Sequence, residues 1–262
     1  MCLIAFAFRA HPDYRLILAA NRDEFHGRPA AAMHWWADYP SLLGGRDLEA
    51  GGTWLAIGES GRFAAVTNYR EDLRTQAGAR SRGELVPGFV AGADAPLEYC
   101  RAIDAAGFAG FSLLAGAGDE MAYVSNRGDG ARALVPGVYA LSNASLDTPW
   151  AKVVRSKRTI ESMLSQETLD VEALFQLLAD REPATTDDVG TGLAPELARA
   201  VSATFIVTPE YGTRCSTVLL IGISGSVEIH ERRFDSAGDL AGEASFVFST
   251  DEFRPGRPSA SD

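Results

Sequence analysis

The chain has 262 residues, of which 46% are hydrophobic and 23% charged, a composition typical of a globular protein with a substantial core. Its formal net charge of -11 at pH 7 disfavours binding to nucleic acid or to an anionic membrane surface. Its three cysteines are too few for a disulfide framework, and no apolar run approaches the roughly 18 to 20 residues of a membrane span or forms a signal peptide, so we expect a cytoplasmic protein.

A β-hairpin is predicted at the start of the chain. Apolar runs over residues 3–8 and 16–20 flank His11-Pro12-Asp13, whose composition is typical of a turn. Cys2 then lies at the start of the first strand. The polar tetrad Asn21-Arg22-Asp23-Glu24 follows the second strand directly, and a returning hairpin would bring it near Cys2.

Beyond the tetrad, the sequence predicts an irregular segment and then alternating strands and helices. Residues 27–51 are rich in Gly, Pro, Ala and Trp without a clear period, which favours an irregular excursion. A helix is predicted from Ser81, because Ser81-Arg82-Gly83-Glu84 has the form of a capping box. Further helices are predicted over residues 96–106, 150–164 and 171–178. Strands are predicted over residues 53–57, 63–67, 111–115, 121–125, 138–142, 203–207, 217–223, 227–234 and 245–248.

This order of elements predicts an α+β fold. Most neighbouring strands are joined by hairpins, which favours antiparallel sheets. Two sheets packed face to face, with helices outside them, would accommodate the order. No linker or internal repeat divides the chain, so we expect residues 1–262 to form a single domain with a loose polar tail from about residue 254.

Cys2 is the candidate nucleophile. Methionine aminopeptidases remove Met1 when the second residue is small, and the product would carry a free thiol and a free α-amine on one residue. The amine has an ordinary pKa of about 7.7 to 8.0, so it can accept the proton of the thiol, whose ordinary pKa is about 8.5. From its position alone, Cys2 is also compatible with the role of a small hydrophobic residue at a strand edge.

Polar residues at the ends of other predicted strands could complete a site around Cys2. A carboxylate of the tetrad could hydrogen-bond the α-amine, while Asn68 and Asn143, each after a strand, could donate to an oxyanion. Arg214 leads into a buried strand, where it could lower the pKa of a neighbouring thiol. Each feature also has an ordinary alternative, namely a solvated turn for the tetrad, a turn residue for either Asn and a surface ion pair for the Arg.

An ordered set of motifs carries a family resemblance. The motifs are Cys2, Asn21-Arg22-Asp23-Glu24, Gly51-Gly52-Thr53-Trp54-Leu55, Thr67-Asn68-Tyr69-Arg70, Ser81-Arg82-Gly83, Leu141-Ser142-Asn143-Ala144, Pro149-Trp150 and Gly212-Thr213-Arg214. Together they resemble the NRDE family, which is also called the transport and Golgi organisation family. The resemblance extends from residue 2 to about residue 250 and so covers nearly the whole chain.

The same motifs are more distantly similar to N-terminal nucleophile (Ntn) hydrolases of the penicillin acylase and bile salt hydrolase type. This resemblance implies a four-layer αββα sandwich of two mainly antiparallel sheets, and an amidohydrolase or acyl-transfer activity on a small amide or acyl substrate. The roles it implies are Cys2 as nucleophile with its α-amine as base, Asp23 to orient the amine, Asn68 and Asn143 as the oxyanion hole, and Arg214 to support the thiolate. The predicted substrate contacts, all within the motifs, are Asn21, Arg22, Trp54 and Tyr69.

One position departs from the hydrolase pattern. Those hydrolases usually carry an Arg three residues before the Asp, where this chain has Ala20. Arg22 is the candidate to replace it, and we expect its side chain to leave the strand in a different direction. The departure bears on how the substrate is recognised.

Two classes of function fit these features. The first is the Cys2-dependent hydrolase or acyl-transfer enzyme. The second is a non-catalytic carrier of an apolar ligand, because members of the family are linked to haem and lipid handling; Trp35-Trp36 could line its pocket or belong to the core. The four histidines lack metal-ligand spacing, so neither a metal site nor a cofactor is predicted. The expected partner is a small-molecule substrate or an apolar ligand, and the oligomeric state is left open.

Overall fold

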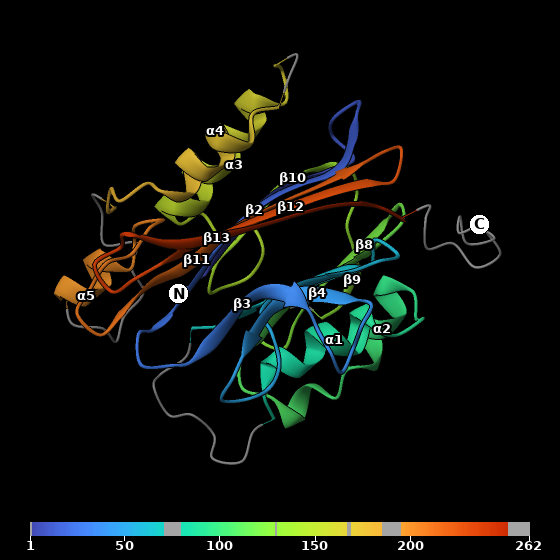
Figure 1. Ribbon diagram of the computed structural model, residues 1–262, viewed down its shortest axis with the longest axis horizontal. Coiled ribbons are helices and arrows are strands. Elements are labelled where there is room, and N and C mark those ends of the chain that lie inside the picture. The colour runs from blue at the N-terminus through green and yellow to red at the C-terminus, as the bar shows by residue number, and fades with distance from the viewer. Residues whose placement is uncertain (1, 71–79, 129, 167–168, 185–194, 251–262) are drawn as a thin grey trace.

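The computed structural model describes residues 2–70, 80–128, 130–166, 169–184 and 195–250, and they form two β-sheets with helices on their outer faces (Figure 1). One sheet has six strands among the described residues, in the order β10-β1-β2-β11-β12-β13. Its strands are β1 (Leu3–Phe8), β2 (Tyr14–Phe25), β10 (Gly137–Leu141), β11 (Tyr211–Gly222), β12 (Ser226–Phe234) and β13 (Leu240–Ser249). All of its neighbouring pairs are antiparallel.

The second sheet has seven strands among the described residues, in the order β3-β4-β5-β6-β7-β8-β9. They are β3 (Ala30–Trp35), β4 (Leu42–Asp47), β5 (Leu55–Gly58), β6 (Phe63–Asn68), β7 (Phe111–Ala117), β8 (Glu120–Ser125) and β9 (Arg132–Ala133). Its neighbouring pairs are also antiparallel, so the two-sheet, α+β architecture predicted from the sequence is confirmed.

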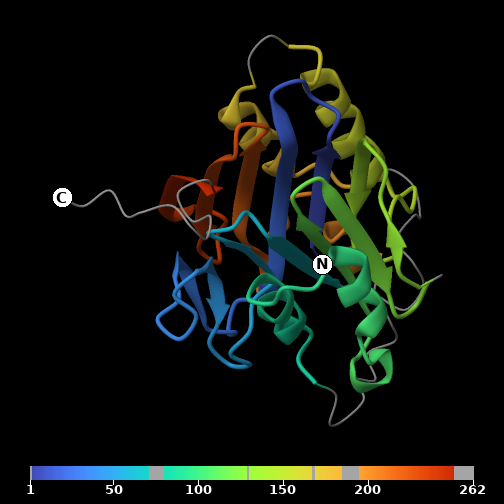
Figure 2. The same cartoon turned by 90° about the vertical axis from the view of Figure 1, so that its right-hand side faces the viewer.

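The helices lie outside the two sheets and give four layers. They are η1 (Arg82–Glu84), α1 (Leu85–Val90), α2 (Pro96–Ala102), η2 (Ala105–Gly107), α3 (Ala151–Met163), α4 (Val171–Leu178) and α5 (Pro195–Ala200). Helices α3 and α4 pack on the six-stranded sheet, whereas α1 and α2 pack on the seven-stranded sheet. Figure 2 shows this order from the side, with the yellow and the green-cyan helices beyond opposite sheets. None of the described helices is both long and apolar enough to cross a bilayer.

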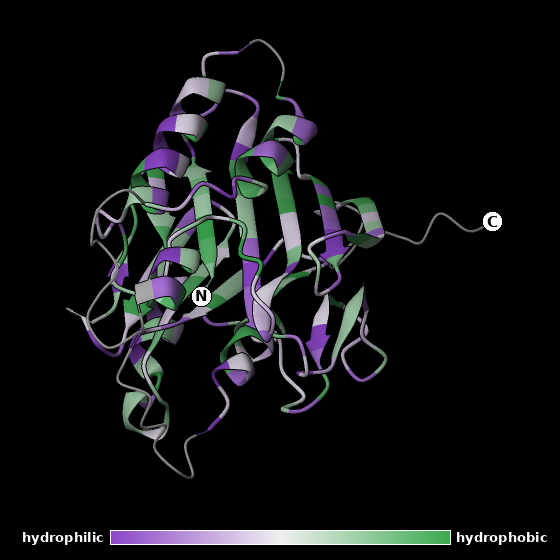
Figure 3. Ribbon diagram, turned by 90° about the vertical axis from the view of Figure 1, so that its left-hand side faces the viewer, coloured by the Kyte–Doolittle hydropathy of each residue, from purple (hydrophilic) through white to green (hydrophobic). Residues whose placement is uncertain are grey.

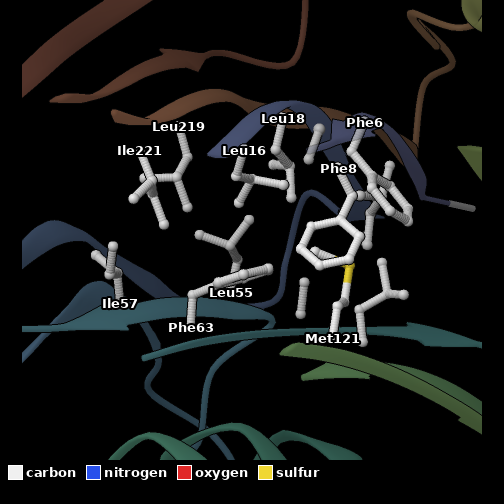
Figure 4. Packing of buried hydrophobic residues seen from close by; sticks show 14 of the residues in the cluster. Phe6, Phe8, Leu16, Leu18, Leu55, Ile57, Phe63, Met121, Leu219 and Ile221 are labelled. Carbon is white, nitrogen blue, oxygen red and sulfur yellow. The ribbon is translucent and has the colours of Figure 1, made fainter. Parts of the chain in front are cut away.

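The largest apolar core fills the space between the two sheets. Phe6 and Leu18 from one sheet face Ile57 and Phe63 from the other (Figure 4). Two further clusters lie under the helices, one on each outer face. The central strands are therefore hydrophobic along most of their length, while the helices and loops carry most of the hydrophilic residues (Figure 3).

Strand β1 illustrates how both faces of the six-stranded sheet are buried. Every residue of β1 is buried, so its sequence has no polar alternation. Its side chains nevertheless alternate between two layers, as the pleat requires. Ile4, Phe6 and Phe8 join the core between the sheets, and Leu3, Ala5 and Ala7 join the cluster under α3 and α4.

Several sequence predictions about local structure were wrong. Residues 27–51 contain β3 and β4 instead of an irregular excursion. Residues 203–207 form no strand: their apolar pattern reflects the burial of a loop, in which Phe205 and Ile206 are 3% and 1% exposed. The helix that begins at Pro96 ends at Ala102 rather than at residue 106, and α5 had no predicted counterpart. The predicted loose tail lies outside the described residues.

Other predictions about local structure were confirmed. Helix α4 spans residues 171–178, as predicted, and α3 differs from its prediction by one residue at each end. The capping-box motif at Ser81 begins a helical segment, in which the Glu84 carboxylate accepts a hydrogen bond from the Ser81 backbone amide at 3.2 Å. Trp36 proves to be core, because it is 1% exposed and its indole donates to the Gly44 carbonyl at 3.0 Å.

The core between the sheets provides a test of the fold. Phe6 is fully buried there, and its ring stacks on Tyr139 with centroids 5.3 Å apart. We expect Phe6→Ala to lower the free energy of unfolding by about 3 to 5 kcal/mol, because it leaves a cavity between the sheets. Urea denaturation monitored by fluorescence would measure it. Val247→Ala is the control, since that side chain is 74% exposed and its truncation should change little.

Candidate active site

The ends of strands from both sheets converge on Cys2. The Ser142 hydroxyl, just after β10, donates to the Cys2 carbonyl at 2.8 Å. The Thr67 hydroxyl of β6 donates in turn to the Ser142 carbonyl at 2.9 Å. A continuous set of hydrogen bonds therefore joins the start of β1 to the end of a strand in the opposite sheet.

The thiol of Cys2 is held next to the tetrad. Its sulfur lies 4.0 Å from the Asp23 carbonyl oxygen, and the residue is half-buried. Burial raises the pKa of the thiol, and the negative charge of Asp23 adds to this, while the positive charge of Arg22 opposes it. In this setting the thiol is a poor nucleophile without a base.

Asp23 lies inside the sheet, not in a turn after it. Strand β2 runs through the tetrad to Phe25, and Asp23 pairs with Thr213 of β11, so the expected end of the strand was wrong. The Thr213 hydroxyl donates to Oδ1 of Asp23 at 2.7 Å, and the Tyr211 hydroxyl donates to its backbone carbonyl at 2.8 Å. Burial raises the pKa of Asp23, and the charge of Lys152 and the Thr213 hydrogen bond oppose that rise.

Arg22 lies on the opposite face of β2, between the two sheets. Its guanidinium lies 4.4 Å from the centroid of the Trp54 ring, and 3.9 Å from carboxylate oxygens of both Glu24 and Asp47. Ala20 joins the same inter-sheet core. The expectation that Arg22 leaves the strand in a different direction from residue 20 was therefore wrong, because residues two apart in a strand share a face.

The two predicted oxyanion-hole residues are brought together. The Asn143 side-chain amide donates to the Asn68 carbonyl at 2.8 Å, which uses one of its two N–H groups. The Asn143 carbonyl accepts from the Arg70 backbone amide at 2.7 Å, which fixes the loop after β6 beside the loop after β10. Asn143 is 3% exposed, whereas Asn68 is exposed.

The remaining predicted site residues have different surroundings. Asn21 is buried under the helices, where its amide donates to the Leu178 and Thr204 carbonyls, each at 2.9 Å. Arg214 donates to the carbonyls of Phe25 and His26 at 2.9 and 3.0 Å, so it fixes the loop after β2. The arginine whose charge acts on the Cys2 thiol is Arg22.

Tyr69 lies directly after β6. Its backbone amide donates to the Gly110 carbonyl at 2.9 Å, which holds the segment that follows Asn68 against the start of β7. Its side chain is half-buried. Tyr69 is thus adjacent to the oxyanion-hole candidates along the chain.

Lys152 is a member of the site that the sequence analysis missed. It lies in the first turn of α3, is 2% exposed, and donates to the Val201 carbonyl at 3.2 Å. Burial lowers the pKa of Lys152, and the charges of Asp23 and Cys2 oppose this. The available sequence signal was its position two residues after the Trp150 of the Pro149-Trp150 motif, in a helix whose buried face is otherwise mainly apolar.

A row of polar side chains continues from Cys2 across the six-stranded sheet. Arg22 pairs with Cys215 in the register of β2 and β11. Burial raises the pKa of Cys215 well above its ordinary value, and the nearby Glu231 adds to this. Glu231 itself is 1% exposed and accepts a hydrogen bond from the Met33 backbone amide at 2.9 Å.

A cavity of about 220 Å³ lies away from Cys2. Its apolar lining includes Phe8, Leu16 and Ile221, near the hairpin turn between β1 and β2. Cys2 is at the other end of β1, about 20 Å away at the ordinary rise of a strand. The chemical groups and the cavity therefore occupy opposite ends of the sandwich.

Comparison with known proteins identifies the family. The family model described as Transport and Golgi organisation 2 matches residues 1–236. The chain belongs to the Transport and Golgi organisation 2 family. A Bos taurus protein named Transport and Golgi organization protein 2 homolog is 40% identical over 256 residues, which cover 88% of this chain and 92% of that protein. The corresponding Homo sapiens protein is 38% identical over 258 residues, with the same coverage. A Drosophila melanogaster member of the family is 31% identical, covering 84% of this chain and 88% of that protein.

Solved structures with the same fold are Ntn hydrolases. The mutant C2A conjugated bile acid hydrolase from Clostridium perfringens superposes with a TM-score of 0.54 at 8% identity, covering 94% of this chain and 92% of that chain. The Caenorhabditis elegans ortholog of N-acylethanolamine-hydrolyzing acid amidase gives a TM-score of 0.50 at 10% identity, covering 84% and 92%. At these identities the likeness establishes the fold alone, and it confirms the predicted Ntn-hydrolase-like sandwich.

The raised pKa of Asp23 predicts a pH-dependent stability. The unfolded carboxyl ionises near pH 4, whereas the folded one retains its proton to higher pH, so stability falls as pH rises above about 4. Asn at this position can still accept the Thr213 hydrogen bond but carries no charge. We therefore expect the melting temperature of Asp23→Asn, relative to that of the parent, to be higher at pH 8 than near pH 4. Calorimetry across this range would measure the difference between the two proteins, and a difference that is the same at both pH values would contradict the burial argument.

Proposed function

We propose that the protein is an N-terminal-cysteine amidohydrolase or acyl-transfer enzyme, which acts on a small amide or acyl substrate after Met1 is removed. The observation that carries the proposal is the convergence of Cys2, Asp23, Asn68 and Asn143 at one end of an Ntn-hydrolase-type sandwich, through hydrogen bonds between the two sheets. The three described cysteines are free thiols, which supports a reducing, cytoplasmic location as part of the proposal.

The reaction begins with the paired groups of Cys2. Removal of Met1 exposes the α-amine, which takes the thiol proton while Asp23 orients it. The thiolate then attacks the substrate carbonyl carbon, a C–S bond forms, and the carbonyl oxygen becomes an oxyanion. The Asn143 side-chain amide and the groups of Asn68 stabilise that charge. The proton passes from the amine to the departing nitrogen as the C–N bond breaks, which leaves a thioester on Cys2.

The thioester is then resolved by a second nucleophile. Water, or an acceptor amine or alcohol, adds to the carbonyl carbon as the α-amine of Cys2 removes its proton. The C–S bond breaks, the thiolate recovers the proton, and the acyl group leaves as an acid or as a transferred product. Water gives hydrolysis and another acceptor gives acyl transfer, so one site accounts for both reaction classes.

Removal of Met1 is an activation step in this proposal, because the buried Cys2 thiol needs a base. Burial and Asp23 both raise the pKa of the thiol, so the thiol is protonated near neutral pH. A free amine on the same residue provides the missing base at the shortest distance that the chain allows. Arg22, which faces the inter-sheet space beside Trp54, and Tyr69 after β6 are proposed to contact the substrate. Arg214 acts by holding the loop after β2.

Selective alkylation of Cys2 tests the proposal. Mature protein from its own host would be analysed by intact mass and then treated with iodoacetamide at pH 7.5. We expect Met1 to be absent and one modification on Cys2. Cys100, with a pKa raised by burial to about 12, and the buried Cys215 serve as internal controls that stay unmodified.

Two variants complete the test. Cys2→Ala should lose the modification, and any amidase activity found with a panel of N-acyl amides, while it keeps the parent's melting temperature. Cys2→Ser keeps the size and the amine but replaces the thiolate by a much weaker nucleophile, so activity should fall at least about 100-fold. Retained Met1 together with an unreactive Cys2 would rule out the enzyme.

A second candidate function is supported by the cavity at the opposite end of the sandwich. Its volume of about 220 Å³ and the apolar side chains of Phe8, Phe63 and Met121 suit a short acyl chain. Ordinary ligand pockets begin at roughly 300 Å³, so the cavity favours a small apolar tail over a large macrocycle. A carrier of such a ligand would use this cavity and would not need Cys2.

Binding of decanoic acid distinguishes the two candidates. A carrier should bind it equally well as the parent chain and as Cys2→Ala, because the cavity is remote from Cys2. Ser60→Trp, at an exposed position on the cavity rim, should then weaken binding about tenfold or more by filling the entrance. Isothermal titration calorimetry would measure all three proteins. If neither the parent nor Cys2→Ala binds, the carrier candidate fails for this ligand class.

A further inference from the structure

Lys152 occupies a position that the fold alone does not explain. Its side chain is 2% exposed, and its one described hydrogen bond is to the Val201 carbonyl at 3.2 Å. An ammonium group has three donors. No ion pair of Lys152 is found among the described residues, whereas Lys157 on the same helix pairs with Asp147 at 3.0 Å. Taking an ammonium ion out of water costs several kcal/mol unless it is compensated.

Its place on the helix adds to this cost. Helix α3 begins at Ala151, so Lys152 lies in the first turn, where the macrodipole favours negative charge. Beside it, a cavity of about 10 Å³ is lined by Lys152, Arg70 and Trp150. That volume is close to the lower limit for one water molecule. The surroundings therefore combine a second cation, an unfavourable dipole and almost no solvent.

The compensation comes from the candidate active site. Asp23 of β2 and Cys2 before β1 are the acidic groups whose charges favour the protonated form of Lys152, against the burial that lowers its pKa. Lys152 in turn favours the ionised form of Asp23. Arg70 and Arg155 act in the opposite sense on Lys152. Hydrogen bonds place these groups on one face of the sheet. Lys152 donates to the Val201 carbonyl, and the segment that follows Val201 reaches Ile206, whose backbone amide donates to the Thr213 hydroxyl at 2.9 Å. That hydroxyl donates to Asp23, so Lys152 and Asp23 both lie in the helix layer, whereas Arg22 lies in the inter-sheet layer.

We propose that Lys152 is a positioning residue of the Cys2 site, whose positive charge in the helix layer favours the ionised forms of Asp23 and Cys2 against the burial that disfavours them. The inference rests on the proposed function and deepens it. In the mature chain the same charge opposes protonation of the neighbouring α-amine and so keeps it available as a base. Lys152 contacts neither the substrate nor the reacting atoms.

The pH dependence of Cys2 alkylation in the full mature chain tests the proposal. The charged and titratable groups around the site are the N-terminal α-amine, Cys2, Arg22, Asp23, Arg70, Lys152, Arg155, Cys215 and Glu231. Lys152→Met removes the charge at similar length, Lys152→Arg keeps it, and Lys157→Met is the matched control on the same helix. Iodoacetamide rates would be measured between pH 5.5 and pH 9.5, with melting temperatures for each protein.

We expect Lys152→Met to slow alkylation of Cys2 at pH 7 about tenfold or more, because one pKa unit corresponds to a tenfold change in thiolate. The midpoint of its rate profile should move to higher pH. Lys152→Arg should keep most of the parent's rate, and Lys157→Met all of it. The melting temperature of Lys152→Met should stay level or rise, because a buried ammonium is replaced by an apolar side chain.

A second measurement separates this inference from the proposed function. The carboxyl carbon of Asp23, followed by NMR during a pH titration, should show a higher pKa in Lys152→Met than in the parent. An inert Cys2 in the parent would overturn the proposed function, and the Asp23 titration would still decide the role of Lys152. If the pH profiles of Asp23 titration and of Cys2 alkylation are unchanged in Lys152→Met, the proposed role of Lys152 is overturned. The proposed role is also overturned if Lys152→Met and Lys152→Arg lose the Cys2 alkylation rate equally and both have lowered melting temperatures, because that result indicates a structural role.

Discussion

Strand β2 is buried on both of its faces, and the arrangement of the candidate site depends on this constraint. Its neighbour β11 pairs with it from Tyr14 to Phe25, and its neighbour β1 pairs with it from Leu16 to Asn21. A strand in that position can send side chains only into the inter-sheet core or into the layer beneath the helices. Apolar residues satisfy both layers up to Ala20, and the tetrad then places charges into each of them.

The two faces of β2 carry opposite charges, and the surroundings of these charges differ. Arg22 enters the inter-sheet space, where Trp54 covers it and the carboxylates of Glu24 and Asp47 lie near it. Asp23 enters the helix layer, where Thr213 donates to it and Lys152 faces it. Cys2 lies at the strand edge between these environments. The sheet therefore separates an arginine and a carboxylate that are adjacent in sequence, and the thiol is exposed to the fields of both.

Buried charges at this end of the molecule carry a stability cost that the apolar remainder of the structure offsets. Asp23, Lys152 and Glu231 are each at most 3% exposed, and burial is the largest influence on the pKa of all three. Such groups are concentrated at functional sites, where strain and desolvation are retained for chemistry. Elsewhere the space between the same sheets is filled by apolar residues such as Phe6 and Leu18, which carry no charge to be desolvated. The molecule is thus divided between an apolar sandwich and one polar end.

The sequence by itself determined the antiparallel layering, because hairpin turns and apolar runs are local signals. The motifs that resemble an established family also placed Cys2, Asn68 and Asn143 correctly at strand ends or beside them. The sequence alone could not determine that β2 continues through Asn21–Phe25, since polar residues predict a turn unless their partners on β11 are known. Nor could it find Lys152, whose pattern is that of an ordinary helical lysine. Only the tertiary structure decided which face each charge enters, because burial and electrostatic partners arise from residues that are far apart in the chain.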